Sequence, residues 1–202
     1  MKKLVSLATA CVLVAAAGNA FAAGSAAAGK AKSGSCAACH GVDGNSGAPN
    51  FPKLAGLDAG YIAKQLADFK AGARKDPMMS GMAMPLSKKD MEDLGAYYAS
   101  QKRAAGTASL DENRRKLAET LYRGGSAKMG IPACMGCHGP AGAGIPVQFP
   151  AVSGQHASYT AKQLTDFKAG GRTNDGGIMG PIAFKMSEAE IKAVSEYMAG
   201  LH

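Results

Sequence analysis

The residues best suited to chemistry form two Cys-x-x-Cys-His motifs, at positions 36–40 and 134–138. Two thiols three residues apart on a helical turn lie on one face, where they can add to the two vinyl groups of a haem. The histidine that follows directly is then placed to bind the haem iron. The spacing predicts two covalently attached c-type haems, bound through Cys36, Cys39, Cys134 and Cys137, with His40 and His138 as axial iron ligands.

Other uses of paired cysteines explain the pattern less well. A disulfide in each motif suits an oxidising compartment but leaves both histidines unexplained. A thioredoxin-like redox pair needs a βαβ context, and the chain shows no strand pattern. A zinc site needs a fourth ligand, and no further Cys or His repeats between the two parts of the chain. Two copies of the full motif in one chain favour haem.

The chain contains two copies of one pattern, offset by 98 residues. Segment 63–74 recurs as 161–172 with ten of twelve positions identical, and Phe51-Pro52 recurs as Phe149-Pro150. A period near 100 residues is too long for a solenoid and indicates tandem duplication of one small domain. We expect an N-terminal domain at residues 23–105 and a C-terminal domain at residues 106–202.

A methionine is the expected second axial ligand in each copy, because the remaining histidines do not repeat. After residue 172 the offset grows to 100. Met79 and Met179 then each lie eight residues before the serine, Ser87 or Ser187, that starts the last helix of its copy. This matched spacing favours Met79 and Met179 as iron ligands.

Met84 is the rival ligand in the first copy, because Met84-Pro85 resembles the ligand context of several single-haem cytochromes. It stands only three residues before Ser87, and its counterpart is Phe184, which cannot bind iron. The neighbouring Met78 and Met82 are interpreted as soft packing groups in a loop.

Both copies are expected to be all-α, with long loops between helices. A capping box at Ser187 predicts the start of the last helix, and a further helix is expected at residues 110–123, ending at Gly124-Gly125. The expected buried faces are Tyr61, Ile62, Leu66 and Phe69; Tyr159, Leu164 and Phe167; Met91, Leu94 and Tyr98; and Ile191, Val194 and Met198. The Gly- and Pro-rich segments 41–56 and 139–154 are expected to be loops that enclose something.

Residues 1–22 have the pattern of a cleaved secretory signal peptide. Two lysines precede an apolar run at 4–17, and Ala20-Phe21-Ala22 is a small-x-small cleavage site. The run is short for a membrane anchor, and the residues before Cys11 form a poor lipoprotein signal. We therefore expect an exported mature protein that keeps four cysteines.

The basic charge of the chain is spread along its length. The sequence has 23 Lys and Arg against 15 Asp and Glu, a formal net charge of +8. Clusters of basic residues with interleaved aromatic residues are missing from the sequence, so no nucleic-acid partner is expected. The charge is compatible with steering of acidic partners.

Essentially the whole mature chain resembles the dihaem cytochromes c4 of the bacterial periplasm. The likeness rests on the two motifs, on the loop that starts at Gly41, and on segments 154–157 and 159–167. It implies two class I cytochrome c domains related by a pseudo-twofold axis. The ligand positions that carry over are Cys36, Cys39, His40 and Met79, and Cys134, Cys137, His138 and Met179.

One residue departs from the pattern of class I cytochromes, in which a proline carbonyl commonly accepts the ring N–H of the proximal histidine. Pro49 fits that role in the first copy, but its counterpart in the second copy is Val147. The local support of the two haems is therefore expected to differ.

The resemblance implies electron transfer from a quinol-oxidising complex to a terminal oxidase, often with loose membrane association. With His and Met both bound, the iron has no open position, so no enzymatic activity is expected. The alternative is a dihaem peroxidase-like enzyme or an oxidase subunit with one labile ligand, and the matched methionines argue against it. A haem-based sensor would need an output domain, which the sequence lacks.

Haem also accounts for a shortage of core-forming residues. The chain has no Trp, six Phe and six Tyr among 202 residues. Aromatic side chains usually supply the largest buried areas, and domains of under about 100 residues are marginal without them. We expect that either domain without its haem lacks sufficient core to fold.

Overall fold

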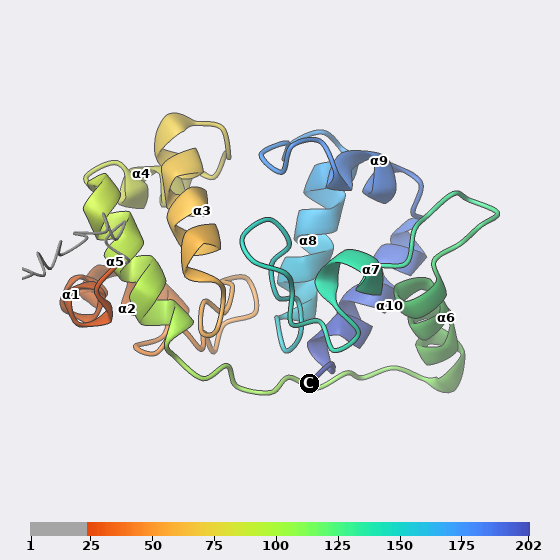
Figure 1. Ribbon diagram of the computed structural model, residues 1–202. Helices are drawn as coiled ribbons and strands as arrows, with labels where there is room; N and C mark the ends of the chain where they lie inside the picture. Colours follow the sequence, from red (N-terminus) through yellow and green to blue (C-terminus); the bar gives the residue numbers. More distant parts are fainter. Residues whose placement is uncertain (1–23) are drawn as a thin grey trace, which may run out of the picture.

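The computed structural model describes residues 24–202, and the expected signal peptide at residues 1–22 lies outside that range. The chain forms two halves that lie side by side, joined by the extended segment 102–111 (Figure 1). Each half supplies five helices, and α3 of the first half faces α8 of the second (Figure 1). This arrangement agrees with the expected duplication of one small domain.

The helices of the two halves follow each other in the same order. The first half contains α1 (Ala26–Lys32), α2 (Gly34–His40), α3 (Ala59–Ala71), α4 (Pro77–Ala83) and α5 (Lys88–Ala99). The second half contains α6 (Glu112–Gly124), α7 (Met135–His138), α8 (Ala157–Lys168), α9 (Met179–Phe184) and α10 (Glu188–Ala199). In residues 24–202 the only β-structure is two isolated bridges, so the expected all-α class is confirmed.

The helix boundaries follow from local capping chemistry. Ser87 and Ser187 both form complete capping boxes, although the sequence indicated only the second. Gly72 ends α3 in the left-handed conformation, at φ 73°. The predicted helix at residues 110–123 begins slightly later, at Glu112, because the side chain of Asp111 accepts a hydrogen bond from the backbone N–H of Arg114.

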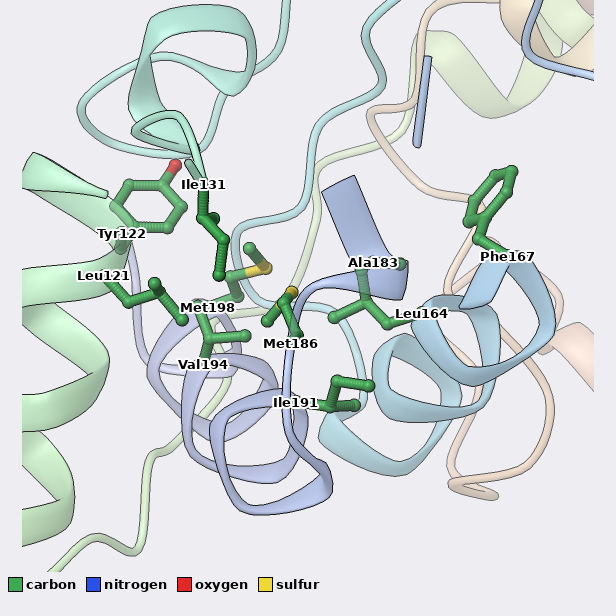
Figure 2. Close-up of a cluster of buried hydrophobic side chains, with 10 residues drawn as sticks. All are labelled: Leu121, Tyr122, Ile131, Leu164, Phe167, Ala183, Met186, Ile191, Val194 and Met198. Carbon is green, nitrogen blue, oxygen red and sulfur yellow. The ribbon is translucent and has the colours of Figure 1, made fainter. Parts of the chain in front are cut away.

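The second half has a compact apolar core that joins four of its helices. Leu121 and Tyr122 come from α6, and Leu164 and Phe167 come from α8; Figure 2 shows these two pairs at opposite sides of the cluster. The remaining members are Ile131, Ala183, Met186, Ile191, Val194 and Met198. The expected buried face of the last helix is therefore confirmed.

The core of the first half is smaller. It consists of Leu57, Ile62, Leu94, Tyr97 and Tyr98, with Tyr61 and Leu66 packed against it and partly buried. The predicted faces of α3 and α5 thus point inward, as expected.

In each half a tyrosine from a core helix also fixes the loop after the cysteine motif: the Tyr97 hydroxyl donates to the Val42 carbonyl, and the Tyr122 hydroxyl donates to the Gly139 carbonyl.

The two terminal helices of the first half, α1 and α5, cross at a glycine. A Cβ placed on Gly29 would lie 2.0 Å from the carbonyl oxygen of Asp93 and 2.8 Å from the Cβ of Tyr97. Backbone atoms cannot move aside cheaply, so only glycine permits this close approach.

Within residues 24–202 no helix combines the length and apolar character needed to cross a membrane.

We expect Gly29→Ala to destabilise the folded protein by about 1–3 kcal/mol, because the added methyl group must separate α1 from α5. Gly34→Ala is the matched control, since a Cβ at Gly34 meets nothing within 4 Å. The control should change stability by less than about 1 kcal/mol. Chemical denaturation of the two variants measures the difference, and equal stabilities would show that the crossing is not constrained by Gly29.

Candidate functional site

Each cysteine motif forms a short helical turn that ends at its histidine. Cys36 and Cys39 lie on α2, and Cys134 and Cys137 lie at the start and on the last turn of α7, all four partly buried and free of disulfides. The chain then turns sharply at Gly41 and at Gly139, each with φ 79°. An L-residue rarely adopts this conformation, so glycine is needed directly after each histidine.

The surroundings of Cys134 do not suit redox or nucleophilic chemistry of its thiol. A reactive thiol needs a lowered pKa. Burial instead raises the pKa of the Cys134 thiol to about 11. This observation weakens the thioredoxin-like interpretation of the motif.

The two histidine rings are buried and held by identical hydrogen bonds. His40 donates from Nδ1 to the carbonyl oxygen of Pro52 at 2.8 Å, and His138 donates to that of Pro150 at the same distance. A carbonyl only accepts, so the proton must lie on Nδ1, which leaves Nε2 with its lone pair available for a metal. Burial lowers the pKa of both rings, although the hydrogen bond to the proline carbonyl acts in the opposite sense. The lowered pKa favours the neutral form of each ring.

The expectation that Pro49 accepts the histidine N–H is wrong. The acceptor is Pro52, and its counterpart at the 98-residue offset is Pro150, so the two histidines share the same direct acceptor. The carbonyl of Pro49 instead accepts a hydrogen bond from Ser158. The repeated Phe-Pro pair was the signal in the sequence, and the two phenylalanine rings, Phe51 and Phe149, lie edge-on to the histidine rings.

Each half encloses an apolar cavity onto which the expected ligands converge. The first cavity measures about 440 Å³ and is lined by Cys36, Cys39, His40 and Met79. The second measures about 470 Å³ and is lined by Cys134, Cys137, His138 and Met179. These volumes lie in the range of small-molecule and cofactor sites. The structure therefore brings together all eight residues that the sequence singled out, four at each cavity.

The methionines differ in their access to the first cavity. Met79 lies in α4 and lines the cavity, as do Met78 and Met82 of the same helix, whereas Met84 is 58% exposed and lies outside the lining. Of the three that line it, only Met79 has a methionine counterpart in the second half. Asp76 accepts a hydrogen bond from the backbone N–H of Met79 at 3.0 Å, and Asp175 does the same for Met179 at 2.5 Å. The sequence placed these methionines in loops, but each belongs to a short helix: Asp76 is the N-cap of α4, whereas α9 begins after Ile178 and Asp175 accepts from Met179 from outside the cap position.

Tyr98 supplies the first cavity with an unpaired polar group. Its hydroxyl is buried and has no hydrogen-bond partner within residues 24–202, and the side chain lines the cavity. Burial also raises the pKa of this hydroxyl, so it remains protonated. A polar edge of a bound group can accept this hydrogen bond. The sequence indicated Tyr98 only as a core residue, since nothing in the helical pattern distinguishes a packed ring from one that faces a cavity.

The two cavities share one wall. Seven residues line both of them: Tyr61, Gln65, Pro150, Gln155, Tyr159, Gln163 and Arg172. These residues come from α3, from α8 and from the loops beside them. The cavities are therefore separated by a single layer of side chains.

Two buried arginines cross-link this wall in a reciprocal way. Arg74 of the first half donates to Tyr159 at 2.9 Å and to Gln163 at 2.7 Å. Arg172 of the second half donates to Tyr61 at 3.2 Å and to Gln65 at 3.3 Å.

Each guanidinium also lies over a phenylalanine ring of its own half, at 4.6 Å from Phe69 or 4.5 Å from Phe167. Because each arginine bonds to the opposite half, the two halves are held in one fixed arrangement.

Comparison with known proteins gives matches along both halves. The family model described as cytochrome c matches residues 21–102 and 122–202. Cytochrome c4 of Pseudomonas aeruginosa is 54% identical, over 92% of this chain and 92% of the relative. A thiosulfate dehydrogenase electron acceptor of Stutzerimonas stutzeri is 42% identical, over 82% of this chain and 78% of the relative.

The fold also matches a solved structure. The crystal structure of reduced recombinant cytochrome c4 from Pseudomonas stutzeri has a TM-score of 0.84 and 52% identity. The match covers 89% of this chain and 100% of that chain.

Proposed function

Because the chain belongs to the cytochromes c4 within the cytochrome c family, we propose that it carries electrons in the periplasm from a quinol-oxidising complex to a terminal oxidase. The family establishes two c-type haems and a role in electron transfer. The donor, the acceptor and the direction are the proposal. The pair of apolar cavities that share one wall supports the carrier role, while the donor and the acceptor rest on the resemblance to the cytochromes c4.

The residues around each cavity fit a haem. We propose that Cys36 and Cys39 hold the first haem covalently and that His40 and Met79 ligate its iron. At the second haem the same roles fall to Cys134, Cys137, His138 and Met179. The haem iron supplies the chemistry, since it stores one electron by changing between its ferric and ferrous states. Support comes from the Nδ1-protonated histidines, the predominantly apolar lining and the unpaired Tyr98 hydroxyl.

The protein's own residues suit the retention of ligands better than catalysis. Each histidine is oriented by a proline carbonyl, and the backbone N–H of each methionine donates to an aspartate side chain. Such outer partners fix the orientation of ligands and tune their basicity. A peroxidase-like enzyme needs one site with a labile ligand, and both cavities offer the same Cys, Cys, His and Met set.

The shared wall supports electron exchange inside one molecule. Only side chains such as Tyr61, Gln65 and Tyr159 lie between the two cavities. The reciprocal bonds of Arg74 and Arg172 keep this layer from opening. An electron that enters one half can therefore leave from the other.

The domain limits and location belong to the same proposal. We place the domains at residues 23–105 and 106–202, with the boundary inside the extended segment 102–111. Export to the periplasm rests on the signal pattern of residues 1–22, and peripheral attachment to the inner membrane is compatible with it.

A second candidate donor is a thiosulfate dehydrogenase. It is favoured by one observation, the 42% identity to a protein named as the electron acceptor of that enzyme. The carrier function is the same in this case, and only the source of the electrons changes.

We expect Met79→Ala to remove the thioether ligand from the first haem only. The far-red absorption band of methionine-ligated ferric haem should lose about half its intensity, and the reduced variant should bind carbon monoxide rapidly at one haem per molecule. Met84→Ala is the matched control and should leave both properties unchanged. Loss of the band in Met84→Ala, with an unchanged spectrum in Met79→Ala, would reverse the assignment.

Reconstituted electron transfer tests the function. Purified protein, verified by intact mass to carry two haems, is added to membranes that contain a quinol-oxidising complex and a terminal oxidase but lack soluble cytochrome. We expect quinol-driven oxygen consumption to rise with added protein, without peroxide turnover by the protein alone.

A parallel reaction with thiosulfate and its dehydrogenase distinguishes the second donor. If the protein is reduced by thiosulfate and its dehydrogenase but not by the quinol-oxidising complex, the dehydrogenase replaces that complex as the donor. Turnover of peroxide at an enzymatic rate would contradict the carrier role.

A further inference from the structure

A segment of the second half fastens the loop that supports His40 in the first half. Gln155, His156 and Ser158 lie at the start of α8, and all three bond to the loop at residues 46–53. His156 bonds through Nε2 to the carbonyl of Ser46 at 2.8 Å, and Ser158 donates to the carbonyl of Pro49 at 2.7 Å. His156 is the N-cap residue of α8, and its ring reaches the other half.

Gln155 makes the most constrained of these contacts. Its side-chain oxygen accepts from the backbone N–H of Lys53 at 2.9 Å, and its side-chain nitrogen donates to the carbonyl of Lys53 at 2.9 Å. Gln155 is 6% exposed and Lys53 is 7% exposed, so neither bond competes with bulk water. An amide that pairs with both backbone groups of one residue fixes the position of that residue.

The N–H of Lys53 and the carbonyl of Pro52 belong to the same peptide group. That carbonyl accepts the Nδ1–H of His40 at 2.8 Å. A continuous chain of hydrogen bonds therefore runs from His40 through the Pro52–Lys53 peptide to Gln155. Hydrogen bonds in such chains polarise one another, so a partner on the N–H makes the carbonyl a stronger acceptor.

The second half lacks this arrangement. The counterpart of Gln155 at the 98-residue offset is Leu57, a buried apolar residue. The counterpart of Lys53 is Ala151, whose N–H makes no hydrogen bond within the part of the chain that the structure describes. The carbonyl of Pro150 thus accepts from His138 without support on the other side of its peptide.

We propose that Gln155, a residue of the second half, is a positioning residue for the first haem, acting through the Pro52–Lys53 peptide on His40. By strengthening the bond from His40 it makes the imidazole a better electron donor, which stabilises the ferric state and lowers the midpoint potential of the first haem. The inference rests on the proposed ligation by His40. The share of electrons held by each haem then depends on the contact between the two halves.

The test is Gln155→Leu, which introduces the residue that the repeat places at position 57. Gln155 lines both cavities, so both potentials can move, but we expect that of the first haem to rise more. The difference should shift the electron distribution about threefold, which is roughly 30 mV for one electron. A redox titration followed by NMR resolves the two haems. The Nδ1 proton of His40 in the reduced protein should move upfield as its hydrogen bond weakens.

Ser158→Ala is the matched control, because it removes another bond between the halves without touching the Pro52–Lys53 peptide. It should leave both potentials and the His40 proton unchanged. Equal shifts in Ser158→Ala and Gln155→Leu would overturn the inference, because they would reflect general loosening of the contact. An unchanged His40 proton in Gln155→Leu would overturn it as well.

Gln155→Met keeps the test decisive if Gln155→Leu does not fold, because methionine keeps the unbranched shape of the side chain but removes both hydrogen-bonding groups. The His40 proton should again move upfield, and a proton that does not move contradicts the inference. Failure of the proposed ligation by His40 gives a different result. In that case His40→Gly would leave the low-spin spectrum of the first haem intact.

Discussion

The fold depends on a space that its own side chains do not fill. Each half closes around an apolar cavity of more than 400 Å³, and the buried apolar cluster of the first half has five members against ten in the second, within the described residues. Burial of apolar surface is the main force that stabilises a folded domain. A haem tethered through two cysteines supplies such surface, so the prosthetic group is a structural element of each half as well as the site of electron storage.

The tandem repeat gives the two halves matching sites, and the contact between the halves gives those sites different surroundings. The arginine bonds across the wall are reciprocal, with Arg74 and Arg172 in matching roles. The loops are held differently: Gln155 and His156 bond from the second half to the loop of the first, whereas Arg103 donates from the first half to the carbonyls of Ala151 and Ser153. A symmetric wall suits electron exchange, while these unequal contacts give the two haems different surroundings even though both cavities are lined by the same Cys, Cys, His and Met set.

Much of this structure could be predicted from sequence, where residue types themselves carry the signal. The cysteine motifs, the repeat offset and the capping serine Ser187 each need particular side chains, and all lie where expected. The acceptor for His40 was misassigned to Pro49 because a backbone carbonyl needs no particular residue. The contact of Gln155 with Lys53 could not be foreseen, since it depends on how the two halves pack together.

The dependence of the fold on haem is tested most directly by the thermal unfolding of the mature chain produced without haem attachment. Circular dichroism and calorimetry of this haem-free chain should show little helix and no cooperative transition. The haem-loaded protein, measured in parallel, should show both. A haem-free chain with full helical content and a cooperative melt would show that the polypeptide alone supplies a sufficient core.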